Sequence, residues 1–229
     1  MFEPWTGVYL IGALICFTVA YRTFFVKKNP SQSRKIFGLV SLFGGVICIL
    51  DFLTQVAGPV MLSIYLQDII GFLYPLTVFL FMLMPLTLQS KLENKTILRI
   101  MVLPLLIGLL PIICGEITGV ENRNFNDIVF VKLIYNEIVY YIWLFLNAMP
   151  LVVMYYFFYK IFKLPDVRAN ADSMNRLETF VFAFTLLIFV GYVTAIAEVI
   201  YGTPPLSSVG VAVGISLAMG AFKVRHEKM

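Results

Sequence analysis

The chain has 229 residues, of which 60% are hydrophobic and 13% charged, and its formal net charge at pH 7 is +4. With a mean hydropathy of +0.91, this composition excludes a soluble globular domain and indicates a membrane protein. We interpret the small positive charge as a topology signal, which excludes nucleic acid as an expected partner.

Seven segments are long and apolar enough to cross about 30 Å of hydrocarbon as helices. In chain order they are residues 5–26, 36–57, 61–88, 97–117, 129–160, 177–201 and 205–222. These long runs lack the alternation of a β-barrel, and the connections between them are too short for a further folded domain. The sequence therefore predicts an all-α bundle of seven transmembrane helices that forms a single membrane domain over residues 1–229.

The basic residues are distributed unevenly between the two predicted sides of the membrane. Fifteen lysines and arginines fall in alternate loops on one side, whereas the other side holds only Arg123 and Lys132. Because cytoplasmic loops are enriched in basic residues, this bias predicts an N-terminus outside and a C-terminus in the cytoplasm. We expect an integral multi-pass membrane protein in this orientation.

Few residues are suited to catalysis or metal binding. The only histidine is His226, in the charged tail, and the three cysteines all fall within apolar segments. No Gly-rich phosphate loop, Gly-x-Ser-x-Gly motif or Cys-x-x-Cys pair occurs. We therefore predict no catalytic residues, no metal site and no enzymatic activity. The last predicted helix contains no lysine, so retinal is not expected, and we predict no other cofactor.

Acidic residues in the apolar segments are the most informative feature. Each costs roughly 2.5 to 3.5 kcal/mol at the bilayer centre, so such residues usually serve a function. The four that fall in the outer halves of predicted helices are accompanied by amide and tyrosine side chains. The predicted proton- or ligand-binding residues are Asp51, Gln55, Asp68, Glu137, Tyr140 and Glu198. They predict an outward-facing acidic and aromatic cavity for a proton, a small cation or an amine.

A simpler interpretation competes for the acids near the outer ends of predicted helices. Glu116 and Glu198 are close enough to these ends that their side chains can reach the lipid headgroups. Asp51 and Asp68 lie deeper in apolar segments, where a functional role or a buried polar network is the better explanation.

The layout resembles that of one known family. The first loop reads "KKNPSQSRK", and the chain ends "PPLSSVGVAVGISLAMGAFKVRHEKM", a Pro- and Gly-bearing last helix followed by a short basic exit. In this the chain is similar to the seven-transmembrane N-terminal sensor region of prokaryotic histidine kinases, without any kinase domain here. The resemblance implies a sensor in a prokaryotic cell membrane that signals to a separate cytoplasmic protein.

Three functions remain open on the sequence alone. The first is a receptor-like sensor, in which binding in the outer cavity changes helix packing and thereby a cytoplasmic partner. The second is a small proton- or cation-coupled transporter, which needs polar residues through the inner half of the bundle as well. The third is a membrane assembly subunit without catalytic activity. The inner halves are mostly apolar, which favours the sensor over the transporter.

Overall fold

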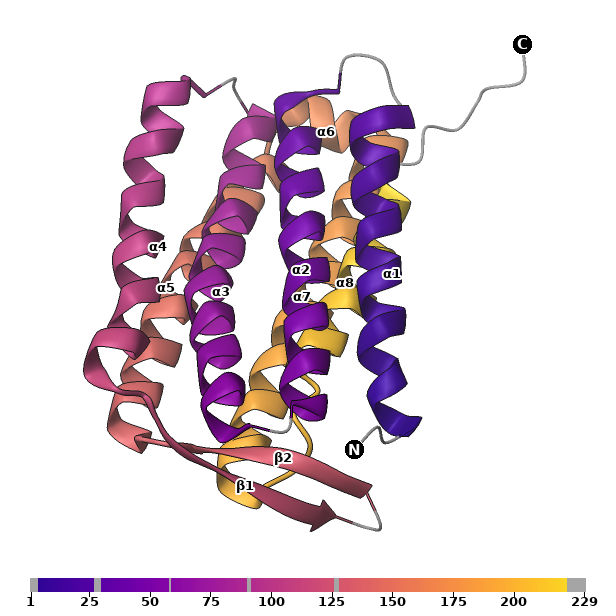
Figure 1. The fold of residues 1–229 in the computed structure, drawn as a ribbon. Helices are drawn as coiled ribbons and strands as arrows, with labels where there is room; N and C mark the ends of the chain where they lie inside the picture. The colour runs from indigo at the N-terminus through magenta and orange to yellow at the C-terminus, as the bar shows by residue number, and fades with distance from the viewer. Residues whose placement is uncertain (1–3, 27–29, 58, 90–91, 126–127, 222–229) are drawn as a thin grey trace.

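A computed structural model describes residues 4–26, 30–57, 59–89, 92–125 and 128–221. Helices stand side by side, and a two-stranded hairpin crosses one end of the bundle (Figure 1). We call this the hairpin end and the other the opposite end. The tail that contains His226 lies outside the described residues.

The elements follow one another along the chain with short connections. They are a 3₁₀ turn Pro4–Thr6, α1 Gly7–Tyr21 with a π-helical extension Arg22–Val26, α2 Gln32–Val56, α3 Val60–Gln89, α4 Asn94–Cys114, β1 Ile117–Phe125, β2 Ile128–Tyr135, α5 Glu137–Phe162, α6 Pro165–Ala169, α7 Ala171–Tyr201 and α8 Ser207–Ala221. Six of the described helices, α1 with its extension, α2, α3, α4, α5 and α7, are long and apolar enough to cross a membrane. They identify a helical multi-pass membrane protein. The shorter α8 is apolar over Ser207–Met219.

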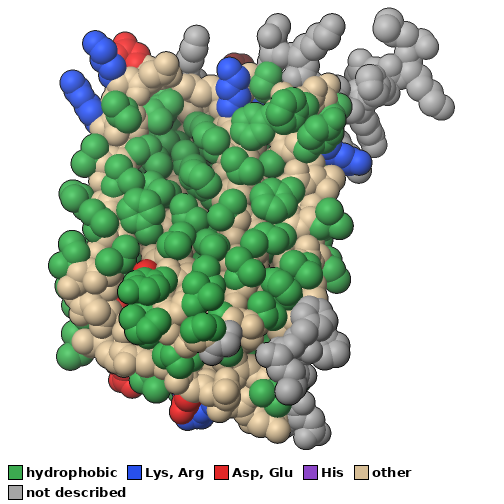
Figure 2. Space-filling model, viewed as in Figure 1, with side chains coloured by type: hydrophobic (Ala, Val, Ile, Leu, Met, Phe, Trp, Pro, Cys, Tyr) green, Lys and Arg blue, Asp and Glu red, His purple; other side chains and the backbone are tan. Residues whose placement is uncertain are grey.

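The second half of α3 lies at the centre of the bundle. Every residue from Pro75 to Pro85 is buried, as expected for a helix that is apolar on all sides. Helices α2, α4 and α5 pack against α3, while α1 and α7 pack against α8. The face seen in Figure 2 is covered mainly by apolar side chains, and most of its charged side chains lie at the two rims. This arrangement suits a bundle surrounded by lipid.

Glycines allow α8 to approach α7 closely. A Cβ atom on Gly214 would lie 2.3 Å from the Cβ of Leu187, and one on Gly210 would lie 2.7 Å from a methyl carbon of Val190. Both distances are shorter than atoms tolerate without movement. Small residues at these positions therefore hold α8 in the bundle by close van der Waals packing.

The hairpin corrects the prediction for residues 129–136. The sequence predicts that the fifth helix begins at residue 129, but Ile128–Tyr135 is strand β2 and α5 begins at Glu137. A short apolar run such as "IVFVKLIY" fits a strand as well as a helix, and its β-branched and aromatic residues favour the strand. Pairing with the polar strand β1, in which Val120 faces Leu133 and Asn122 faces Val131, decides between them. A small antiparallel sheet is thus added to the predicted all-α architecture.

Candidate functional site

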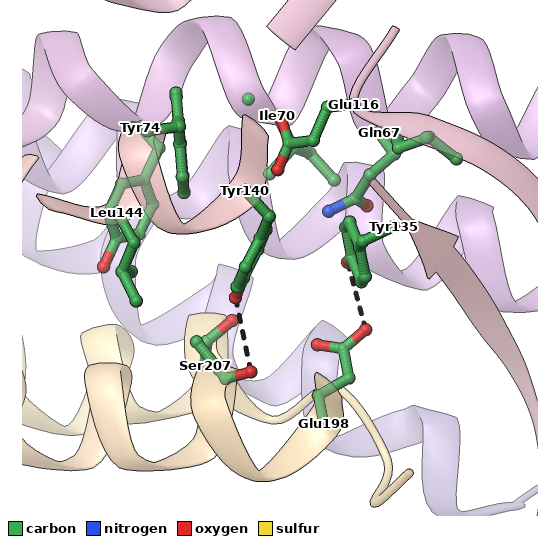
Figure 3. A pocket seen from close by; sticks show the side chains of 13 residues that line it. Gln67, Ile70, Tyr74, Glu116, Tyr135, Tyr140, Leu144, Glu198 and Ser207 are labelled. Atoms are coloured by element: carbon green, nitrogen blue, oxygen red, sulfur yellow. Dashed lines mark hydrogen bonds between the residues drawn. The ribbon is translucent and has the colours of Figure 1, made fainter. Parts of the chain in front are cut away.

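A small cavity lies beneath the hairpin, between α3, α5 and α7 (Figure 3). Its volume is about 50 Å³, enough for a few water molecules. Its lining combines carboxyl, phenol, amide, indole and aliphatic groups. The lining residues are Gln67, Ile70, Gly71, Tyr74, Glu116, Ile117, Tyr135, Tyr140, Trp143, Leu144, Ala195, Glu198 and Ser207. In the described part of the chain, no lysine or arginine lines this hairpin-end cavity.

Glu198 of α7 points into the hairpin-end cavity, which Tyr135 and Tyr140 also line (Figure 3). The Tyr135 hydroxyl donates a hydrogen bond of 3.1 Å to Oε1 of Glu198. Burial, and to a lesser extent the charge of Glu198, raise the pKa of Tyr135 well above its usual value, so this phenol remains a donor. The Tyr140 hydroxyl donates to the Ala195 carbonyl oxygen at 3.3 Å, one turn from Glu198.

Glu116 enters the hairpin-end cavity from the turn that joins α4 to β1. Gly115 has a left-handed backbone, with a φ of 63°, which a glycine adopts without strain and which ends α4 sharply. The Glu116 amide then donates to the Pro111 carbonyl at 2.9 Å, and its carbonyl accepts from the Asn136 amide at 2.6 Å. Burial, together with the nearby Asp68 carboxylate, raises the pKa of Glu116 to about 7. Its carboxyl group therefore gains and loses a proton near neutral pH.

Asp51 of α2 lies near Glu198 but does not line the cavity. Its carboxyl group is close enough to Glu198 and to Tyr9 of α1 for electrostatic interaction. The Ser208 side chain lies beside it, and the buried Ser208 Oγ has no hydrogen-bond partner within standard distance among the described residues. The exposed fractions of Asp51, Glu116 and Glu198 are 6, 5 and 4%. These three buried acids form what we call the acid cluster.

Gln55 has a structural role in the fold. Its Nε2 donates to the Val131 carbonyl at 3.1 Å, and its Oε1 accepts from the Val131 amide at 2.8 Å. The side-chain amide thus pairs with the free edge of β2 as a neighbouring strand would. The predicted ligand-binding amide instead fastens the hairpin to α2.

Two other predicted residues lie outside the acid cluster. Asp68 is half-buried on α3 and near enough to Glu116 for electrostatic repulsion, but its neighbour Gln67 lines the hairpin-end cavity in its place. Glu137 is exposed in the first turn of α5, where the helix dipole favours an acid. It borders a shallow depression with Glu121, Arg123 and Lys132. Of the six predicted residues, the fold brings only Asp51, Tyr140 and Glu198 together.

Lys132 of β2 is the basic residue that interacts with Glu198. Its side chain is 15% exposed, and its Nζ lies 4.0 Å from Oε1 of Glu121. It also borders Gly202, at the C-terminal end of α7, where a cation is favoured by the helix dipole. Because Lys132 is a single cation and also interacts with Glu121, it cannot neutralise all three buried carboxyl groups.

Two buried polar atoms on α5 are left without a partner. Nε1 of Trp143, which lines the hairpin-end cavity, and Oδ1 of Asn147, one turn further along, form no hydrogen bond with the described residues. Buried polar atoms are almost always paired, with protein or with water. The free indole donor therefore indicates that the cavity holds water or another hydrogen-bond acceptor.

The sequence pointed to only part of the acid cluster. For Glu116 the sequence favours an interaction with the lipid headgroups over a role in the cavity, and Tyr135 falls inside the predicted helix 129–160. The β-branched and aromatic content of residues 128–135 was the available signal for a strand that carries Tyr135. Ser208 and Trp143 carried no comparable signal, because a serine or tryptophan in an apolar helix is most often a packing residue.

The arrangement suits the binding of protons, water or one small cation. Among the described residues, no group of three or more histidine, cysteine, aspartate or glutamate side chains is placed to hold a metal ion. The volume of the hairpin-end cavity is too small for a large amine as the helices stand.

No protein-family model matches the chain, and no curated protein matches it.

Proposed function

We propose that this protein is a membrane sensor in which protonation of the acid cluster changes helix packing. The observation that carries the proposal is the burial of Asp51, Glu116 and Glu198 near one another, with no basic side chain in the described lining of the cavity. Ionised carboxylates so close together repel one another, and a bound proton or small cation relieves that repulsion. Proton occupancy is thereby coupled to the arrangement of α2, α7 and the hairpin.

The proposed topology counts α8 as a seventh span and places the hairpin end outside the cell. Supporting it is the distribution of basic residues along the sequence, which assigns fifteen of them to the other side of the membrane and only Arg123 and Lys132 to this one. In this orientation the acid cluster senses the external medium. The opposite end, which is rich in lysine and arginine, faces the cytoplasm and a signalling partner there, as the resemblance to histidine kinase sensor regions implies.

Helix α2 provides a route for the signal between the two ends. Asp51 lies one turn before Gln55, which holds β2. At its other end α2 carries Gln32, whose side-chain amide donates to the Leu92 carbonyl and accepts from the Leu92 amide, both at 2.9 Å. A continuous helix with a paired amide at each end transmits a shift at Asp51 to the turn between α3 and α4.

The test uses Trp143 as the reporter of cavity protonation. The sequence has two tryptophans, so Trp5→Phe leaves Trp143 as the only one. In nanodiscs, its emission should change as the pH is varied between about 5 and 9, and Glu116→Gln with Glu198→Gln should remove most of that change. Glutamine retains the acceptor for Tyr135 but does not titrate. The exchange rate of the Leu92 amide should follow the same pH transition.

Glu137→Gln is the matched control, because Glu137 is exposed and lies outside the acid cluster. It should leave the fluorescence transition unchanged. A flat fluorescence profile in the parent protein, or an undiminished transition in the Glu116 and Glu198 double variant, would overturn the proposal.

A second candidate function, proton transport, is favoured by a cavity at the opposite end. It has a volume of about 370 Å³ and is lined partly by Ser31, Ser33, Ser173 and Arg176. Against transport, phenylalanines lie between the two ends. Phe180 lines the opposite-end cavity, and its ring centroid lies 4.5 Å from that of Phe184. The ring centroid of Phe184 in turn lies 4.3 Å from that of Phe81. Proton flux in proteoliposomes that is lost in Asp51→Asn would favour transport over sensing.

A further inference from the structure

A groove between α4 and α5 lies apart from the acid cluster. It has a volume of about 600 Å³, within the roughly 300 to 1,000 Å³ of small-ligand pockets. Its floor is α3, and apart from Arg99 every lining side chain is apolar. Leu103, Leu106 and Met149 on its rim have more than half of their surface exposed, so the groove opens sideways from the bundle toward the surrounding lipid.

The groove is long, and only one of its ends is charged. It follows α4 from Arg99 to Leu110, about 16 Å along the helix axis. Arg99 lies in the second turn of α4, near the membrane border at the opposite end of the bundle. From there the apolar lining leads toward the middle of the membrane, which is the direction of an acyl chain whose headgroup is at the border.

Arg99, at the charged end of the groove, and Lys95, one turn away on α4, have no counter-ion among the described residues. Lys95 and Arg99 are four residues apart and share one face of α4. Among the described residues, neither forms a salt bridge or a side-chain hydrogen bond. Two exposed like charges on one face repel each other, and a phosphate group between them relieves this repulsion.

We infer that this groove binds one anionic phospholipid of the surrounding bilayer. One acyl chain lies along the groove over α3, and the phosphate group is held by the Arg99 guanidinium, with Lys95 one turn away. Charge complementarity selects an anionic headgroup over a zwitterionic one, because the latter brings its own cation to the two basic side chains. The site is separate from the acid cluster and does not depend on the sensor function.

Native mass spectrometry of the full chain with equimolar phosphatidylglycerol and phosphatidylcholine tests the inference. The wild type should retain phosphatidylglycerol in preference, and Arg99→Gln should reduce this preference by about tenfold, as expected for the loss of one charged hydrogen-bonding group. Arg99→Lys should give an intermediate value, since lysine keeps the charge but loses the bidentate geometry. Leu106→Trp, which fills the groove, should reduce the retention of both lipids.

Matched controls are available on α1, on another side of the bundle. Arg22→Gln removes an exposed basic residue at the same end of the bundle, and Leu14→Trp enlarges another exposed leucine. Both should behave as the wild type, and the melting temperature of each variant in detergent should show that it is folded. Equal retention of the two lipids by the wild type, or equal losses in Arg99→Gln and Arg22→Gln, would overturn the charge selection. Equal lipid retention in Leu106→Trp and Leu14→Trp would show that the groove is not the binding site.

Discussion

Gln55→Met is expected to lower the free energy of unfolding by roughly 2 to 5 kcal/mol, because it leaves the Val131 amide and carbonyl groups buried and unpaired. Methionine has a similar length, so the packing volume at the site is largely kept. The hairpin should be destabilised more than the rest of the protein, since Gln55 is bonded directly to the free edge of β2. Amide hydrogen exchange in Ile117–Tyr135 should accelerate well before the helices are affected.

Gln32→Met provides the matched control at the other end of the same helix. It removes the same pair of hydrogen bonds, here to Leu92, but at a half-buried position. Water can replace the lost bonds there, so the loss of stability should be smaller. Exchange should accelerate at Leu92 and not in the hairpin. If Gln55→Met leaves hairpin exchange unchanged, the paired amide does not hold the hairpin and α2 is not the route between the ends.

The stability of the wild type is expected to fall as the pH rises through about 7, and Glu116→Gln should remove the part of this fall that the titration of Glu116 causes. The Glu116 carboxyl group titrates near 7 in the folded protein, against 4.5 for an ordinary glutamate. At pH values between these two pKa values, Glu116 is protonated in the folded state and ionised in the unfolded state. The stabilisation is therefore complete below about pH 4.5 and is lost as the pH passes 7, a change of roughly 3 kcal/mol.

Melting temperatures in detergent across this pH range provide the measurement. Above pH 7, Glu116→Gln should be more stable than the wild type, because a neutral amide avoids the buried charge. Glu121→Gln removes an exposed carboxylate that is paired with Arg123, and its pH profile should run parallel to that of the wild type. A wild-type stability that rises from pH 5 to 8 would contradict the assignment of a protonated, buried Glu116.

These two results bear on separate parts of the sensor proposal. The pH profile tests whether a carboxyl group of the acid cluster changes its protonation near neutral pH. The exchange pattern tests whether α2 is joined mechanically to the hairpin and to the α3–α4 turn. A protein that passes the first test and fails the second would bind protons without a described route for transmitting the change.

The sequence by itself was sufficient for the membrane class and for the six long helices in outline, because long apolar runs in a chain of this composition have few other stable structures. It also identified Asp51, Tyr140 and Glu198 as polar groups on different helices near one end of the bundle. Their common level follows from the sequence because the position of a residue along a helix is counted directly along the chain.

Only the tertiary structure showed that residues 117–135 form a hairpin, that Gln55 binds this hairpin, and which acids belong to the acid cluster. Residues 128–135 are apolar enough for a helix, and only pairing with β1 and with Gln55 makes them a strand. That strand carries Tyr135 to Glu198, and the turn at Gly115 brings in Glu116 from outside the helices. Glu137, which the sequence grouped with these acids, lies at the exposed start of α5. The rotation of each helix and the path of the connecting loops depend on contacts between distant segments. The spacing of residues along the sequence does not reveal these contacts.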